Sequence, residues 1–151
     1  MNTTDEIEIS QSEWETMRVI WTLNGASSKQ IIAILAEKLG WKASTTKTYL
    51  GRLVKKGALS TTKNGREYVY QPLIEEQVAM NNATSGLFDH LCQHKVGPTL
   101  TTLINNVELS QSDIEELINE LNQKAKTAPE MVKCNCLPDG CDENCEMEEM
   151  K

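Results

Sequence analysis

The sequence predicts a mainly helical fold that also contains one small β-hairpin. Before residue 57, apolar residues recur with the period of a helix in three successive stretches, each bounded by residues that start or stop helices. The pattern then changes to the alternation of short strands on both sides of Asn64-Gly65, a strong signal for a tight hairpin. Helical patterns resume after Pro72 and continue to about residue 127.

The first two helices are expected over residues 10–24 and 27–40. Each opens on a serine, Ser10 or Ser27, that is followed three residues later by Glu or Gln, the spacing of a capping box. Each ends at a glycine, which readily adopts the left-handed conformation that follows many helices. One face of the first helix is formed by Trp14, Met17, Ile20 and Trp21.

A third helix is expected from Ser44 to Gly57, and the two strands of the hairpin from residue 59 to residue 72. The apolar face of this helix consists of Leu50, Leu53 and Val54. Three helices followed by a hairpin within residues 10–72 form a winged helix-turn-helix, a variant of a DNA-binding motif. Residues 1–9 are expected to be disordered.

Residues 73–127 are expected to form a helical dimerisation domain. Ser112 and Glu115 have the spacing of a capping box for its last helix. The apolar stripes are Leu87, Phe88 and Leu91, then Leu100, Leu103, Ile104 and Val107, and finally Ile114, Leu117, Ile118 and Leu121. These helices are too few and too narrow-faced to enclose a core alone, so we expect a second copy of the chain to complete it as a homodimer.

The charge of the chain is unevenly distributed. The formal net charge is −7, yet the stretch from Gly40 to Arg66 holds seven basic residues and no acidic one. Such a block indicates a surface that meets an anionic partner, although a merely solvated basic helix is the alternative. With Leu50 pointing inward, hydroxyl and basic side chains of the third helix point outward, where they can meet bases and phosphates. The expected DNA contacts are Ser44, Thr45, Lys47, Thr48, Arg52, Lys55 and Lys56 on the helix, with Lys63 and Arg66 on the hairpin.

The sequence shows no secretory signal and no apolar run long enough to cross a bilayer, so a cytoplasmic protein without membrane contact is expected. Thiols stay reduced in that compartment, and closely spaced cysteines there indicate metal ligands before disulfides. No constellation of catalytic residues is evident, so we expect no enzymatic activity.

Four of the five cysteines lie within twelve residues of an acidic tail, residues 128–151, which is expected to be flexible. Four thiolates suit Zn(II) in a tetrahedral site, or Cu(I), which favours soft sulfur ligands. A redox disulfide switch and a disordered tail with incidental cysteines are the alternatives. The expected metal ligands are Cys134, Cys136, Cys141 and Cys145.

The fifth cysteine, Cys92, lies between two histidines. His90 and His94 have a spacing that would place them on one helical face, but no third ligand lies near them in sequence, so we expect an ordinary surface role. Cys92 is expected to point the other way, as a half-buried small residue.

The stretches EWETMRVIW, WKASTTKTYLGRLVKKGAL and SQSDIEELINEL, with the hairpin before the last, resemble the penicillinase-repressor family of bacterial winged-helix regulators. The resemblance covers residues 10 to about 123. The tail is similar to the copper-responsive, CopY-type branch, whose members end in C-x-C-x4-C-x-C. Cys134, Cys136 and Cys141 match that motif, whereas Cys145 departs from it because the last pair here is C-x3-C.

The resemblance implies that a zinc-bound dimer holds a palindromic operator and represses copper-export genes. Cu(I), donated by a copper chaperone, is then expected to displace the zinc and release the DNA. Two other functions stay open: a β-lactam-responsive or constitutive repressor whose tail metal is structural, and a metal-buffering or metal-transfer protein.

Overall fold

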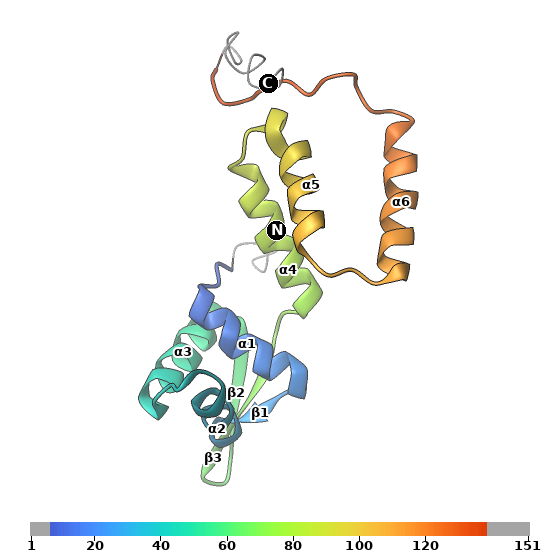
Figure 1. Cartoon of the computed structure of the whole chain (residues 1–151). Coiled ribbons are helices and arrows are strands. Elements are labelled where there is room, and N and C mark those ends of the chain that lie inside the picture. Colours follow the sequence, from blue (N-terminus) through green and yellow to red (C-terminus); the bar gives the residue numbers. More distant parts are fainter. Residues whose placement is uncertain (1–6, 139–151) are drawn as a thin grey trace. The chain divides into compact units, whose positions relative to one another are not determined.

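The computed structural model describes residues 7–138 of the chain. Within that range it contains six α-helices, a short 3-10 helix and a three-stranded antiparallel sheet (Figure 1). The predicted fold class, mainly helical with a small sheet, is confirmed. The chain forms two compact units that divide between Gly86 and Leu87, inside helix α4 (Glu76–Asp89).

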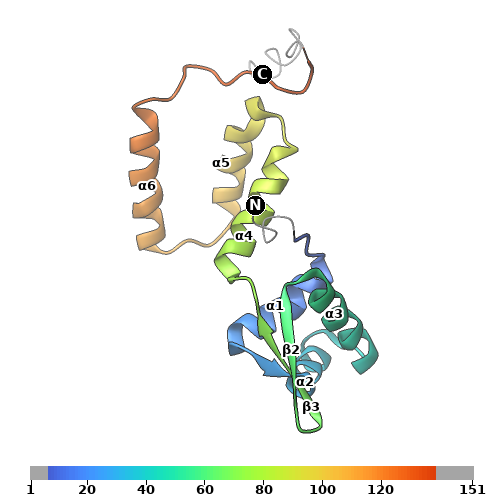
Figure 2. The same cartoon turned by 180° about the vertical axis from the view of Figure 1, so that it is seen from behind.

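The N-terminal unit carries the first three helices, the sheet and the larger part of α4. Its strands lie in the order β1-β3-β2, and β2 and β3 form the predicted hairpin, whose turn at Gly65 has the positive φ of 68° that glycine tolerates best. Both views show that this hairpin, hereafter the wing, projects beyond the helices of the unit (Figures 1 and 2). In chain order the elements are α1 (Gln11–Leu23), β1 (Ala26–Ser27), α2 (Ser28–Leu39), α3 (Ala43–Lys56), β2 (Leu59–Asn64) and β3 (Glu67–Pro72).

Strand β1 is absent from the sequence prediction, because two residues are too few to show an alternating pattern. Ala26 pairs with Tyr70 and Ser27 pairs with Val69 of β3. Ser27 is also the N-cap of α2, where its side chain and that of Gln30 complete the predicted capping box. A single residue therefore ties the start of α2 to the wing.

A closed apolar core holds the N-terminal unit together. Its largest side chains are fully buried, and each such Leu, Ile or Met stabilises the fold by roughly 1.5–3 kcal/mol relative to an exposed one. The fully buried apolar side chains of largest volume are Met17, Ile20, Ile31, Leu35, Leu50, Leu53 and Leu59. Ile7 and Ile9, which lie in the segment expected to be disordered, pack against this core. Trp21 closes one side by donating its indole N–H to the carbonyl of Ile74 at 2.9 Å.

Two of the predicted capping boxes differ from the structure. At α1, Ser10 caps the N–H of Glu13, but the Glu13 carboxylate is occupied by Lys56 and does not return to the Ser10 backbone. At α6 (Gln111–Ala125) the box is formed by Ser110 and Asp113, two residues before the predicted pair. The sequence contains both overlapping patterns, and the earlier one is used.

The C-terminal unit has no comparable core among its described residues. After α4, a short 3-10 helix, η2 (Gln93–Lys95), leads into α5 (Val96–Asn106), and α6 follows. No residue of α5 or α6 is buried within the chain. The predicted apolar stripes of these helices are exposed, namely Leu100, Leu103 and Ile104 on α5 with Val107 directly after it, and Ile114, Leu117, Ile118 and Leu121 on α6.

Candidate nucleic-acid interface and metal centre

Helix α3 has one buried face and one polar face. Thr46, Leu50 and Leu53 are buried, which leaves the hydroxyl and basic side chains on the other side. No side chain caps its N-terminus at Lys42, whereas serines cap α1, α2 and α6. The first N–H groups of α3 can therefore face an anion such as a phosphate. The exposed members of the predicted set on this helix are Ser44, Lys47, Thr48, Arg52, Lys55 and Lys56, while Thr45 is half-buried.

Arg52 belongs to a stacked group at the surface of α3. Its guanidinium carbon lies 5.5 Å from the centroid of the Tyr49 ring, and that ring lies 5.1 Å from the ring of Trp41. A guanidinium over an aromatic face is attracted to it and loses rotational freedom. Arg52 is therefore held in place while its remaining N–H donors stay available.

Lys56 differs from its neighbours because it already has partners. Its ammonium group lies 2.8 and 2.9 Å from the two carboxylate oxygens of Glu13, and 2.7 Å from the carbonyl oxygen of Glu8. The Glu13 side chain is only 3% exposed, and a buried carboxylate without a cation would be costly. Lys56 therefore makes a stabilising contact inside the unit, which the sequence did not predict, in addition to the DNA contact expected of it.

The wing presents two cations. Lys63 stands opposite Tyr68 in the β2–β3 pair, and Arg66 lies in the turn. Both side chains are exposed, on the part of the unit that projects beyond the helices (Figure 2). This placement suits contact with a sugar-phosphate backbone next to a groove that α3 enters.

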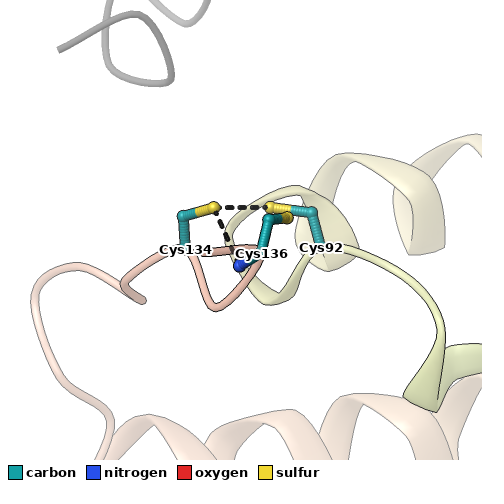
Figure 3. A group of neighbouring side chains, drawn as sticks. All are labelled: Cys92, Cys134 and Cys136. Carbon is teal, nitrogen blue, oxygen red and sulfur yellow. Dashed lines mark hydrogen bonds between the residues drawn. The ribbon is translucent and has the colours of Figure 1, made fainter. Parts of the chain in front are cut away.

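Three cysteine thiols meet in the C-terminal unit. The sulfur atoms of Cys92, Cys134 and Cys136 all lie within 4.8 Å of one another, and Cys92 Sγ is 3.5 Å from Cys134 Sγ (Figure 3). The backbone N–H of Cys136 also donates to Cys134 Sγ at 3.4 Å. The structure thus brings together two of the four predicted ligands and a cysteine that was not predicted; Cys141 and Cys145 lie outside the described residues.

Cys92 is half-buried, as expected, but it lies beside two tail cysteines, which its expected role as an ordinary small residue did not include. Helix α4 ends at Asp89, so Cys92 lies in the turn before η2 and not on a helical face that a wheel can project. The predicted common face of His90 and His94 fails for the same reason, since His90 is exposed and His94 is buried in η2. No local signal could have revealed Cys92, because even the nearer of its partners in sequence, Cys134, is 42 residues away.

Two hydrogen bonds hold the tail segment beside η2. The imidazole Nδ1 of buried His94 lies 2.7 Å from the carbonyl oxygen of Val132, so Nδ1 carries the proton. The backbone N–H of Gln93 donates to Asn135 Oδ1 at 3.1 Å. Val132 lies just before Cys134, and Asn135 lies between Cys134 and Cys136. The two hydrogen bonds therefore hold both tail cysteines beside Cys92.

The thiols influence each other's ionisation. Burial raises the pKa of Cys92, but hydrogen bonds from the Cys134 and Cys136 thiols and from the backbone of His94 and Lys95 outweigh it and lower that pKa to about 7. Hydrogen bonding to Cys134, and to a smaller extent to Cys92, raises the pKa of Cys136 to about 11. One thiolate is thus favoured in the group, and a cation that binds there displaces the remaining protons.

The donor set of this site fits a thiophilic metal ion. It consists of sulfur atoms alone, and sulfur ligands select soft or borderline ions such as Cu(I) and Zn(II) over Mg(II) or Ca(II). The geometry thereby supports metal binding at this place.

Comparison with known proteins defines the family. The sequence pattern of the family described as "Penicillinase repressor" matches residues 9–123. The chain belongs to the penicillinase-repressor family. This family consists of transcription regulators and not of enzymes, in agreement with the sequence prediction. The matched range includes Cys92 and ends before Cys134.

Two relatives of this repressor differ in how far they match. The methicillin resistance regulatory protein MecI of Staphylococcus aureus (strain N315) is 32% identical over 117 residues, which are 78% of this chain and 95% of MecI. An uncharacterized 16.5 kDa protein of the ptsI 3' region of Latilactobacillus sakei is 51% identical over 142 residues, covering 94% of this chain and 96% of that protein. The second match is long enough to reach into the cysteine tail.

Solved structures of repressors align with less than half of the chain. Monomeric BlaI of Bacillus licheniformis in complex with the blaP half-operator is 41% identical and covers 47% of this chain and 87% of that one, with a TM-score of 0.43. The CopR repressor structure is 50% identical and covers 45% of this chain and 99% of that one, with a TM-score of 0.39. In residues 7–138, no helix has the length and apolarity of a membrane span.

Proposed function

We propose that this repressor is metal-responsive, and that cysteines near its C-terminus control how firmly α3 and the wing hold an operator. The observation that carries the proposal is the cluster of three thiols in the C-terminal unit of a chain whose N-terminal unit presents a basic winged helix. Zn(II) is the ion of the repressing form, and Cu(I) is the inducer.

The DNA contacts divide by position. Ser44, Thr45 and Thr48 lie at or near the start of α3, where small side chains let the backbone approach a groove. Arg52 reads base edges, because its planar fork matches guanine O6 and N7. The cations that hold phosphates are Lys47 and Lys55 on α3, and Lys63 and Arg66 on the wing, with Lys56 contributing charge beyond its bond to Glu13.

A homodimer accounts for the open C-terminal unit. The exposed stripes of α5 and α6 form apolar faces of the kind that a second copy of the chain covers. Two-fold symmetry would place two copies of α3 on two half-sites, so the operator is palindromic. One winged helix contacts few bases, and doubling the contacts supplies the affinity that a monomer lacks.

The metal acts through cysteine ligands. Cys134, Cys136, Cys141 and Cys145 supply thiolates, and a bound ion supplies a cross-link between parts of the chain that have no apolar core of their own. Zn(II) favours four ligands in a tetrahedron, whereas Cu(I) accepts fewer sulfur ligands, so exchange rearranges the tail without a large change of charge. A copper chaperone is the proposed donor of Cu(I), and copper-export genes are the proposed target.

Operator binding tests the proposal. Zinc-loaded protein is used to select duplexes from a random pool, and the selected duplex is followed by electrophoretic mobility with increasing Cu(I). We expect release with wild type and none with Cys134→Ser/Cys136→Ser. A metal-buffering protein would show no copper-dependent release. A constitutive or β-lactam-responsive repressor would keep its grip on DNA in Cu(I) whether or not these cysteines are present.

A further inference from the structure

We propose that Cys92 is a ligand of the regulatory metal and that it acts together with Cys134 and Cys136 of the same chain. This inference rests on the proposed function, since it concerns the site of the same metal. It goes beyond the tail motif, because Cys92 precedes that motif by 42 residues and lies in the body of the C-terminal unit.

The distances fit a common ion. With metal–sulfur bonds of roughly 2.3 Å, the sulfurs of a trigonal or tetrahedral site are about 4 Å apart. The three sulfurs here lie within 4.8 Å of one another, and two of them are 3.5 Å apart. Side-chain movements that change the sulfur–sulfur distances by less than about 1 Å are therefore enough to place a metal ion between them.

The tail is brought to Cys92 by contacts that do not involve sulfur. His94 binds the Val132 carbonyl, and the N–H of Gln93 binds the Asn135 side chain. Both partners of each bond belong to the same chain and to the same compact unit. The ligand set is thus prearranged within one chain, and no contribution from a second copy is needed to gather three sulfurs.

The number of sulfurs distinguishes the two metals. Three thiolates satisfy Cu(I), which binds soft ligands in low coordination numbers, whereas tetrahedral Zn(II) requires a fourth ligand. Cys141 and Cys145, later in the tail, are the candidates for that fourth ligand. Cys92, Cys134 and Cys136 therefore bind Cu(I), and neither Cys141 nor Cys145 is a ligand in the copper-bound form.

A metal held in this way has a structural consequence. The segment between Cys92 and Cys134 contains the whole of α5 and α6, which carry the exposed apolar stripes. A bond from metal to both cysteines closes that segment into a loop and restricts its conformations. The ion at the sulfurs is thus connected directly to the helices proposed to form the dimer.

Alkylation tests the ligand. The reduced full-length protein receives one equivalent of Cu(I) per chain without oxygen, is treated with N-ethylmaleimide, and is analysed by peptide mass spectrometry. We expect Cys92 to react in the metal-free protein and to be protected by Cu(I), and to lose that protection in Cys134→Ser/Cys136→Ser. Alkylation of Cys92 at the metal-free rate while Cys134 and Cys136 are protected would overturn the inference.

Affinity provides an independent readout. Competition with a Cu(I) chelator should show that Cys92→Ser binds Cu(I) at least about tenfold more weakly than wild type, since even loss of an outer-shell partner costs that much. Gln93→Ala is the matched control and should bind as wild type does, because Gln93 contributes only its backbone N–H. Equal affinity of Cys92→Ser and wild type would contradict the ligand role.

Mixed dimers test whether the site lies within one chain. Cys92→Ser chains are co-expressed with Cys134→Ser/Cys136→Ser chains and purified by two tags. Because neither chain has a complete set of ligands, we expect no tightly bound Cu(I). Recovery of one tight site per dimer would show that the ligands come from two chains and would contradict the inference.

Copper-dependent release of the operator is measured separately, on the wild-type protein. Release without protection of Cys92 rejects the inference alone, and protection without release rejects only the proposed function.

Discussion

The two units of this repressor achieve order in different ways. The N-terminal unit buries Met17, Ile20 and Leu50 completely, and the buried carboxylate of Glu13 is paired with Lys56. In the C-terminal unit, α5 and α6 bury nothing within the chain, and the described contacts that hold the tail are polar or involve sulfur. A unit with a closed core can keep one shape for binding DNA, whereas a unit proposed to be completed by a second copy and a metal ion can respond to both.

The core of the N-terminal unit provides the largest expected effect. Leu50→Ala should lower the free energy of unfolding of this unit by about 2–5 kcal/mol, because it removes a fully buried side chain and leaves a cavity. Trp14, Trp21 and Trp41, the three tryptophans of the chain, all lie in this unit, so fluorescence during denaturation reports on it alone. Leu103→Ala, at a 46% exposed position, is the control and should change this transition by less than about 0.5 kcal/mol.

The apolar face of α6 gives the next effect. Ile118→Asp should weaken dimerisation by at least about tenfold, roughly 1.4 kcal/mol, because it places a charge within the proposed interface. Asn119→Asp adds the same charge on the opposite side of α6 and should leave the dimer intact. Sedimentation equilibrium measures both. Equal dissociation constants for the two variants would show that this face is not the contact between copies.

Variants of Lys55 and Lys56 distinguish effects on DNA binding from effects on the stability of the fold. Lys56→Gln should destabilise the N-terminal unit by about 1–3 kcal/mol, because Glu13 then keeps a buried charge without its cation. Lys55→Gln should leave stability unchanged and weaken DNA binding, more at low salt than at high salt. Tryptophan fluorescence and a salt series of operator binding check the pair. The same loss of stability in both variants would contradict the structural role given to Lys56.

The smallest effect concerns the start of α6. Hydrogen bonds from the backbone and side chain of Ser110 lower the pKa of Asp113 below its ordinary value of 3.8. Because the pKa is lowered in the folded state, the ionised carboxylate stabilises the helix at every pH above its ordinary pKa. This stabilisation is lost as the pH falls through the lowered, folded-state pKa. Circular dichroism should therefore show less helix in Asp113→Ala than in wild type at neutral pH, and no difference in strong acid. Glu116→Ala, outside the box, should show no such pH-dependent difference.

Local patterns explain why most of the fold was predictable. The capping box of Ser27 and Gln30 and the hairpin around Gly65 depend on residues a few positions apart, so the sequence displays them directly. The exposed basic face of α3 follows from the same helical period. By contrast, β1 exists only because Ala26 finds Tyr70 in the sheet, and such a pairing has no local signature.

The candidate sites show the same division. Cys134 and Cys136 were predicted from their spacing, whereas Cys92 joins them through a turn whose position depends on where α4 ends. The ion pair between Lys56 and Glu13 was not predicted, because a helical wheel cannot show a partner 43 residues earlier in the chain. Contacts between distant parts of the chain thus account for the differences at both sites.

We propose that sulfur ligands in the C-terminal unit control how tightly the N-terminal unit binds DNA. The most direct test is the fluorescence anisotropy of a labelled, selected operator bound by the zinc-loaded protein during an anaerobic titration with Cu(I). We predict that the anisotropy falls to the value of free DNA as each chain takes up copper, and that Cys134→Ser/Cys136→Ser shows no such fall. An unchanged anisotropy for wild type, with copper demonstrably bound, would contradict it.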